Sequence, residues 1–279
     1  MLPGNVLADL FNFLHTLMIT KADIFEAMGR TMFRDFAIIL IAWFGVQAAL
    51  HSGGGSGHGL HSDRLASMLM LIGFGFTMST FYSRPIPGVG YSFSDLILKE
   101  GLYLANIIGG SVSTQIMDRI NGLYWSIEAP GLSAAINALE FLRYAIIVLA
   151  LFAAQATVFV IIAAGYIASA VCILIGPIFI PFFIVPQMEW LFWGWLKALI
   201  QFAFYPVVAN AYVWVLGNLL LRFTDAHPGP YDGFALAQLF APLTIILITF
   251  AYLIFKVPSL VNSIFGGRSG ENVDPGKWL

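Results

Sequence analysis

The spacing of apolar and charged residues predicts a chain that crosses a membrane several times. Residues 144–188 contain no Asp, Glu, Lys or Arg, and this run is about twice as long as the roughly 20 apolar residues of a membrane helix. Its first part fits either one long helix that projects past the bilayer or a hairpin that turns at Gly165. Because no Asn, Asp or Pro marks a turn near Gly165, we favour one long helix.

The end of this run is interrupted by glycine and proline. Gly176-Pro177 is followed by Pro181 and Pro186, and proline has no backbone N–H to donate. The sequence therefore predicts a broken, re-entrant segment over residues 176–187. Irregular backbone at membrane depth persists only where protein or water satisfies its polar groups, so we expect this segment to pack between helices or subunits, or to line a cavity.

Four further apolar stretches predict additional spans, with kinks at Pro206 and Pro242. Trp195 and Trp214 lie 19 residues apart, about 28 Å along a helix, which is typical of aromatic belts at the two membrane interfaces. The total is five spans, or six if the long run is a hairpin. The four stretches are residues 36–50, 65–82, 197–221 and 233–255.

The segments outside these spans are amphipathic. In the largest of them, Ser94 is expected to cap one helix, Gly109-Gly110 to end it, and Ser111 to cap the next. The N-terminal residues are expected to form an amphipathic helix pair on the membrane surface or against the spans. The predicted fold is an all-α membrane bundle in a single domain, 1–279. It comprises an N-terminal segment (1–35), two spans (36–82), an extramembrane loop (83–140), core spans (141–256) and a tail (257–279).

Composition agrees with the membrane interpretation and excludes several functions. The chain is 59% hydrophobic and 10% charged, whereas soluble domains carry about 25% charged residues. A net charge of −2 gives no general affinity for nucleic acid. Cys172 is the only cysteine, so no internal disulfide is possible. The predicted spans also lack charged residues near their centres, where ion-coupled transporters place them.

The polar residues inside the predicted spans are mainly amides, including Gln155, Gln201 and Asn210. The simplest interpretation is that they form hydrogen bonds between helices, worth about 0.6–2 kcal/mol each. The alternative is that these three side chains line a wet conduit.

The sequence predicts neither a catalytic site nor a bound metal or cofactor. His51, His58 and His61 share one glycine-rich turn, but the turn lacks the ligand set and spacing of a zinc site. No Ser/His/Asp arrangement, paired intramembrane aspartates or His-Glu-x-x-His motif is present. We therefore expect a protein that is not an enzyme.

Several motifs follow one another in the second half of the chain. Leu174-Ile175-Gly176-Pro177-Ile178-Phe179-Ile180 precedes Phe192-Trp193-x-Trp195-Leu196, and the last span leads to Val257-Pro258-Ser259-Leu260 and Ile264-Phe265-Gly266-Gly267. This order resembles the TrbL family, the VirB-type polytopic inner-membrane subunits of bacterial type IV secretion systems. The resemblance covers residues 140–270 well and the N-terminal half in outline.

The resemblance implies a role in passing DNA or protein out of the cell and in building the conjugative pilus. It implies a multi-pass protein of the bacterial inner membrane and, as partners, major and minor pilins, assembly ATPases and bitopic scaffold subunits. The many small residues of the long run suggest a homo-oligomer as well. The residues we single out for structure or interaction are Gly176, Pro177, Pro181, Trp190, Trp193, Trp195, Gln155, Gln201, Asn210, Pro258, Gly266 and Gly267.

Orientation and function each retain alternatives. The resemblance implies an external N-terminus, whereas the count of Lys and Arg favours the opposite orientation. A small-solute channel through the Gln155, Gln201 and Asn210 conduit is a second functional hypothesis. A third is a membrane anchor of a redox or other complex, for which the histidine-rich turn is the only feature.

Overall fold

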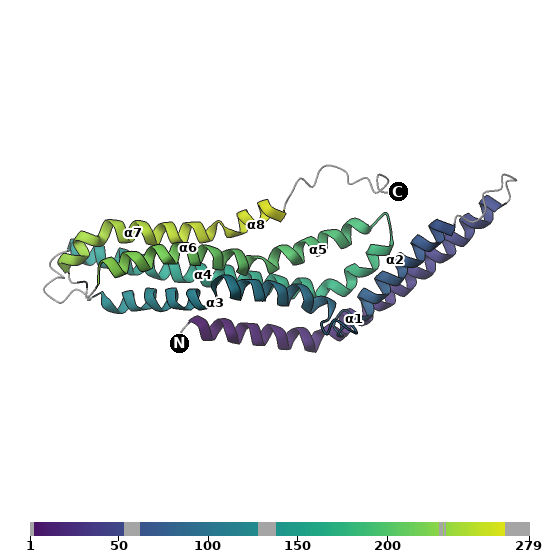
Figure 1. Cartoon of the computed structure of the whole chain (residues 1–279), viewed down its shortest axis with the longest axis horizontal. Coiled ribbons are helices and arrows are strands. Elements are labelled where there is room, and N and C mark those ends of the chain that lie inside the picture. The colour runs from purple at the N-terminus through teal and green to yellow at the C-terminus, as the bar shows by residue number, and fades with distance from the viewer. Residues whose placement is uncertain (1–2, 53–61, 128–137, 229–230, 232, 266–279) are drawn as a thin grey trace. The chain divides into compact units, whose positions relative to one another are not determined.

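The protein is described by a computed structural model at residues 3–52, 62–127, 138–228, 231 and 233–265. Over these residues it contains helices and one isolated bridge between Ile127 and Tyr231, and no β-strand. The all-α prediction is therefore confirmed. The helices are α1 (Pro3–Ser52), α2 (Ser62–Thr80), α3 (Phe93–Ser126), α4 (Ala138–Phe179), the 3-10 helix η2 (Ile180–Ile184), α5 (Glu189–Ala203), α6 (Tyr205–Ala226), α7 (Gly233–Phe255) and α8 (Val257–Phe265) (Figure 1).

Within the described residues, four helical segments are long and apolar enough to cross a membrane. The most apolar of them, Ala138–Ile184, has a mean hydropathy of 2.7. The others are Ala22–Leu50, Glu189–Ala226 and Ala237–Phe265, and Leu65–Thr80 is a shorter apolar helix. The chain is thus a multi-pass membrane protein, as predicted. Of the five predicted spans, the second corresponds to this shorter helix.

The N-terminal prediction of a helix pair followed by a separate span is wrong. A single helix, α1, runs from Pro3 to Ser52. The charged residues of its first half do not interrupt a helix, and no proline occurs between Pro3 and the end of α1 to break it.

The central region also differs from the prediction of two short helices. Helix α3 is continuous through Gly109-Gly110, because interior glycine costs only about 1 kcal/mol and does not remove a backbone donor. The cap is Ser92 rather than Ser94: Ser92 Oγ accepts the Asp95 N–H at 3.1 Å. Ser94 Oγ instead donates to the Tyr82 carbonyl at 2.9 Å.

The long uncharged run forms one helix, as favoured by the sequence. Helix α4 passes through Gly165 without a turn. A Cβ at Gly165 would lie 2.8 Å from Tyr205 Cβ and 2.9 Å from Pro206 Cδ, so glycine serves here to bring α4 close to the start of α6. The break predicted at residue 176 begins later, since α4 includes Pro177 and ends at Phe179.

The C-terminal half is helical almost throughout. The predicted 197–221 span is two helices, α5 and α6, which meet at Phe204 because Pro206 occupies the first turn of α6. Pro242 lies inside α7. The tail, expected to be polar, begins with α8, which buries Val257 and Val261.

The helices form two compact units, each with its own buried apolar residues. Unit 1 comprises Met1–Ala8, Gly101–Tyr166 and Ala203–Leu279, and unit 2 comprises Asp9–Glu100 and Ile167–Phe202. In unit 1, Ile116 packs so closely on α6 that a Cβ at Gly217 would overlap its side chain. In unit 2, α1 and α2 lie side by side, with Phe33 against Gly75.

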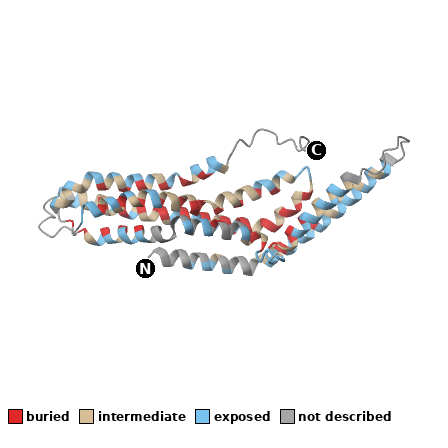
Figure 2. Ribbon diagram, viewed as in Figure 1, coloured by how far each residue is buried: buried red, intermediate tan, exposed pale blue. Residues whose placement is uncertain are grey.

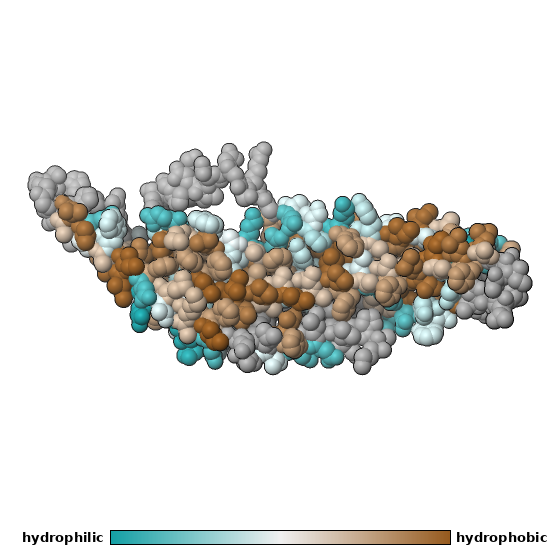
Figure 3. Space-filling view, turned by 180° about the vertical axis from the view of Figure 1, so that it is seen from behind, coloured by the Kyte–Doolittle hydropathy of each residue, from teal (hydrophilic) through white to brown (hydrophobic). Residues whose placement is uncertain are grey.

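The outward-facing side chains of these helices are mostly apolar. Figure 2 shows exposed residues along both α1 and α2, and Figure 3 shows apolar side chains over much of one face. Trp43 on α1 and Met70 on α2 are 61% and 71% exposed. A surface of this kind is stable in contact with lipid or with other protein.

Candidate functional site

The most unusual backbone in unit 2 lies where α4 passes through Pro177. A proline cannot donate to the carbonyl four residues before it, which here belongs to Ile173. The structure supplies another donor, because the hydroxyl of Tyr82 donates to the Ile173 carbonyl at 2.5 Å. Tyr82 is only 2% exposed, so a buried hydrogen bond replaces the missing helical one.

A second buried side chain reaches the adjacent carbonyl. Trp195 on α5 donates its indole N–H to the carbonyl of Cys172 at 2.8 Å, and its ring stacks on Phe179 with the centroids 6.4 Å apart. Tyr82 and Trp195 also contact each other, with a centroid distance of 6.5 Å. Two aromatic donors therefore hydrogen-bond to neighbouring carbonyls about two turns before the end of α4.

Two glycines make this arrangement possible. A Cβ at Gly176 would overlap the Tyr82 hydroxyl and lie 2.6 Å from Trp195 Cζ2. A Cβ at Gly29 on α1 would overlap the Pro177 carbonyl oxygen. Pro181, four residues after Pro177, has no N–H to donate to the Pro177 carbonyl. Gly29 therefore packs against a carbonyl that lacks its normal helical hydrogen bond.

The 3-10 helix after α4 is packed among neighbouring helices of unit 2. Ile180, Pro181 and Ile184 are buried. Phe182 contacts Phe36 of α1 at a centroid distance of 5.6 Å. Phe183 likewise contacts Phe74 of α2 at 5.7 Å and Phe192 of α5 at 5.0 Å. We call Tyr82, Gly176, Pro177, η2 and Trp195 together the helix-break cluster.

The three tryptophans after this segment occupy different environments. Trp195 is 4% exposed, whereas Trp190 and Trp193 are 69% and 50% exposed. Trp193 donates its indole N–H to Glu189 one turn earlier in α5. The predicted belt of Trp195 and Trp214 is wrong, because they lie on separate helices and Trp195 is a buried residue with a specific hydrogen bond.

The three amides proposed to line a conduit are divided between the two units. Gln155 and Asn210 belong to unit 1, and Gln201 belongs to unit 2. Gln155 lines a cavity of about 580 Å³ together with Asn121, Tyr124 and apolar residues of α4. Neither Gln201 nor Asn210 is among the residues that line it.

The remaining predicted residues lie either in α8 or outside the described residues. Pro258 is in the first turn of α8 and is half-buried. Gly266 and Gly267 lie outside the described residues, as do His58 and His61 of the glycine-rich turn. In the part of the chain that is described, no group of three metal-ligating side chains could hold a metal ion.

A polar cavity of about 430 Å³ adjoins the helix-break cluster, and the sequence interpretation did not anticipate it. Within it, Glu26 is buried and pairs with Arg30 at 2.9 Å. The residues that line the cavity come from α1, the loop after α2, the start of α3, and α4. Most of these segments are far apart in the sequence, so no motif connects them. The lining consists of Ala22, Asp23, Glu26, Arg30, Tyr82, Ser83, Arg84, Ser92, Ser94, Asp95, Ile173, Leu174 and Pro177.

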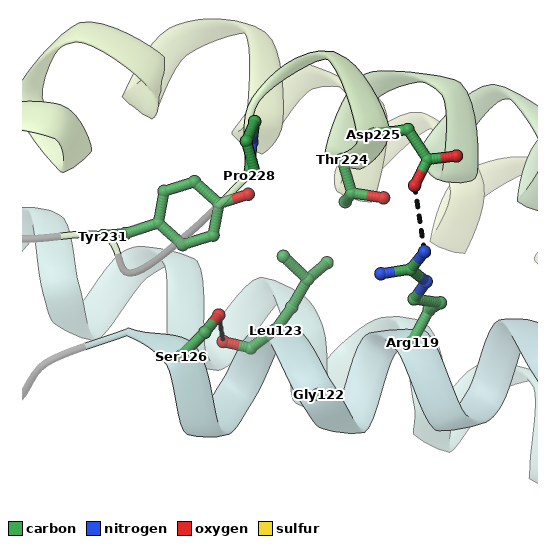
Figure 4. A pocket seen from close by; sticks show the side chains of 8 residues that line it. All are labelled: Arg119, Gly122, Leu123, Ser126, Thr224, Asp225, Pro228 and Tyr231. Atoms are coloured by element: carbon green, nitrogen blue, oxygen red, sulfur yellow. Dashed lines mark hydrogen bonds and ion pairs between the residues drawn. The ribbon is translucent and has the colours of Figure 1, made fainter.

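A second cavity, of about 490 Å³, lies in unit 1 between α3 and the end of α6 (Figure 4). Arg119 pairs with Asp225 at 2.9 Å, but both side chains are exposed, so the pair contributes little stability. Tyr231 joins the segments more firmly: its N–H donates to the Ser126 carbonyl at 3.1 Å. Burial raises the pKa of Tyr231, although Arg119 opposes the shift, and the protonated hydroxyl donates to the His227 carbonyl.

The role of Tyr82 can be tested by removing only its hydroxyl. We expect Tyr82→Phe to lower the free energy of unfolding by about 1–3 kcal/mol, since a buried carbonyl loses its donor. Cys172, the only cysteine, is buried in the same unit, so its rate of alkylation by a maleimide should rise. Tyr103→Phe is the control because Tyr103 is exposed. Equal alkylation rates in the two variants would contradict the assignment.

The helix-break cluster lies within a part of the chain that resembles a known protein family. The family described as TrbL/VirB6 plasmid conjugal transfer protein matches residues 37–257. This range includes the helix-break cluster and the spans from α4 to α7. No curated protein matches the chain.

Proposed function

The chain belongs to the TrbL/VirB6 family of plasmid conjugal transfer proteins, and we propose that it is an inner-membrane platform of a type IV secretion system. In this role it supports transfer of DNA or protein and assembly of the conjugative pilus. The coarser conclusion, a multi-pass membrane component of conjugal transfer, follows from the family and the apolar helices. The platform role rests on the further observations below.

The helix-break cluster is the observation that carries the proposal. A proline in a membrane helix leaves a carbonyl unpaired and weakens the helix at that point. Here Tyr82 and Trp195 supply fixed donors, and aromatic contacts surround the following 3-10 turn. A helix break that is packed against three neighbouring helices is suited to a rigid scaffold on which other subunits assemble.

Charge distribution favours a scaffold over an independent pump. Residues 144–188 carry no charge, and coupled transporters normally require ionisable groups at membrane depth. We infer that energy comes from partner ATPases. The exposed apolar side chains of α1 and α2 provide surface for lipid, for a second copy of the chain, or for pilins and bitopic scaffold subunits.

The proposal is tested by complementation of a conjugative donor that lacks this protein. We expect the wild-type chain to restore plasmid transfer and pilus formation, and a variant lacking residues 178–185 to restore neither. Membrane fractionation must show that both chains insert. Normal transfer by the inserted deletion variant would contradict the platform role.

A second measurement separates the platform from the channel hypothesis. After mild detergent extraction, the full-length protein is expected to co-purify with pilins and a secretion ATPase. Liposomes that contain this protein alone are expected to show no solute flux. Flux that is lost on Gln155→Leu, without co-purifying secretion subunits, would favour a channel instead.

A further inference from the structure

The polar cavity of unit 2 contains charges of both signs in a chain with few charges. Only 10% of the residues are charged, yet five of the thirteen lining residues are Asp, Glu or Arg. Charged groups close to membrane helices are costly to retain and commonly mark a binding function. The volume of about 430 Å³ lies within the range of small-molecule sites.

The position of the cavity along the helices corresponds to the edge of the hydrocarbon layer. Its α1 residues lie at the start of the Ala22–Leu50 span, and Tyr82, Ser83 and Arg84 follow directly after the apolar helix Leu65–Thr80. The helices that carry it expose apolar side chains along their length. On α1, Ile24 and Met28, on the side of the helix away from the cavity, are 65% and 54% exposed. A polar cavity at the ends of apolar helices is an arrangement that suits a phospholipid headgroup.

The chemistry of the lining selects the type of headgroup. Arg84 offers a guanidinium, which binds phosphate oxygens through paired N–H groups. Asp23 offers carboxylate oxygens, which accept hydrogen bonds from a primary ammonium. The buried Glu26 is already paired with Arg30, so it fixes the wall of the cavity and adds no net charge.

We propose that this cavity binds the headgroup of a zwitterionic phospholipid with a primary amine, of the phosphatidylethanolamine type. Arg84 contacts the phosphate, Asp23 contacts the ammonium, and the acyl chains extend from the cavity along the adjoining apolar helices. A bound lipid at this place covers the polar wall beside Pro177 and so contributes to holding the helix-break cluster. The site is independent of the platform role proposed above.

The test is lipid binding to the delipidated full-length protein in detergent, followed by native mass spectrometry. Phosphatidylethanolamine, phosphatidylcholine and phosphatidylglycerol with identical acyl chains are compared. We expect phosphatidylethanolamine to bind most tightly, because phosphatidylcholine has no ammonium N–H and phosphatidylglycerol has no cation. Arg84→Gln should weaken its binding about tenfold, the effect of losing a charge-assisted hydrogen bond. Asp23→Asn should abolish the preference for phosphatidylethanolamine over phosphatidylcholine.

Matched controls lie on α1 outside the cavity. Arg34 and Asp35 are exposed neighbours with side-chain exposures of 70% and 54%, so Arg34→Gln and Asp35→Asn make the same chemical changes away from the site. Slow alkylation of Cys172 establishes that each variant is folded. Equal binding of the three lipids by the wild-type protein, or equal losses in site and control variants, would overturn the proposal.

Two water-soluble probes distinguish a lipid from a free ligand. Glycerophosphoethanolamine carries the headgroup without acyl chains, and inorganic phosphate carries only the anion. We expect the first to compete weakly with the lipid and the second not to compete at millimolar concentration. Full competition by phosphate, or equal affinity for glycerophosphoethanolamine and the lipid, would overturn the assignment to a membrane lipid.

Discussion

Gly176→Ala is expected to destabilise unit 2 strongly although it adds a single methyl group. The new Cβ would overlap the Tyr82 hydroxyl and press on the Trp195 ring, and both side chains are buried and hydrogen-bonded. Overpacking alone costs about 1–3 kcal/mol. If Tyr82 moves away, the Ile173 carbonyl is left unpaired at a further cost of about 1–3 kcal/mol.

The measurement is the free energy of unfolding of the purified protein, together with the alkylation rate of Cys172. Gly194→Ala on α5 is the matched control, because no atom lies within 4 Å of its added Cβ. In an open helical position, alanine is favoured over glycine by about 1 kcal/mol. The two substitutions should therefore act in opposite directions. A Gly176→Ala protein as stable as the Gly194→Ala protein would show that the helix-break cluster is not closely packed.

Gly29 on α1, which packs against Pro177, allows an independent test of the same packing. Gly29→Ala places a methyl group against the Pro177 carbonyl, a backbone atom that cannot rotate away. Gly45→Ala on the same helix meets no atom within 4 Å. If Gly29→Ala and Gly176→Ala each destabilise the protein, the double variant should lose less stability than the sum of the two single losses. Both substitutions disturb the packing around Pro177.

The sequence was sufficient to predict the all-α class, the long uncharged helix and the neighbourhood of the break. A charge-free run and the Gly-Pro pair are local features, and the period and length of apolar segments reflect the bilayer directly. The sequence could not identify the donor for the Ile173 carbonyl. Tyr82 lies 91 residues from Ile173, and any of the ten tyrosines could have served.

The wrong predictions have a common physical origin. Gly109-Gly110 and the charges near the N-terminus suggested helix ends, but helices continue through such residues when no proline intervenes. Trp195 was expected at a membrane interface because tryptophan is enriched there. Its burial depends on α4 and α5 packing together, which residue spacing within one helix does not describe.

Trp195→Ala is expected to destabilise unit 2 strongly. Truncating a buried tryptophan removes about 3–5 kcal/mol of packing, and the Cys172 carbonyl loses its indole donor. Trp195→Phe keeps most of the aromatic surface, so it should be intermediate, with a loss of about 0.5–1.5 kcal/mol from the hydrogen bond alone. Denaturant unfolding in detergent, with Cys172 alkylation as the second readout, measures all three proteins.

Trp193→Ala separates a role in stability from a role in recognition. Trp193 is half exposed and bonds to Glu189 of its own helix, and its ring contacts Phe183 and Phe192 at 6.2 and 5.1 Å. Its loss should therefore cost about 1–2 kcal/mol, less than the loss of the buried Trp195. Plasmid transfer by each variant is then compared with the amount of folded protein in the membrane. Loss of transfer in Trp195→Ala should accompany loss of folded protein from the membrane. Loss of transfer in a fully folded Trp193→Ala protein would mean that this exposed ring contacts another subunit.

If Trp195→Ala instead remains as stable as Trp193→Ala, the indole of Trp195 does not hold the break, and the rigid-scaffold argument for the platform role fails with it.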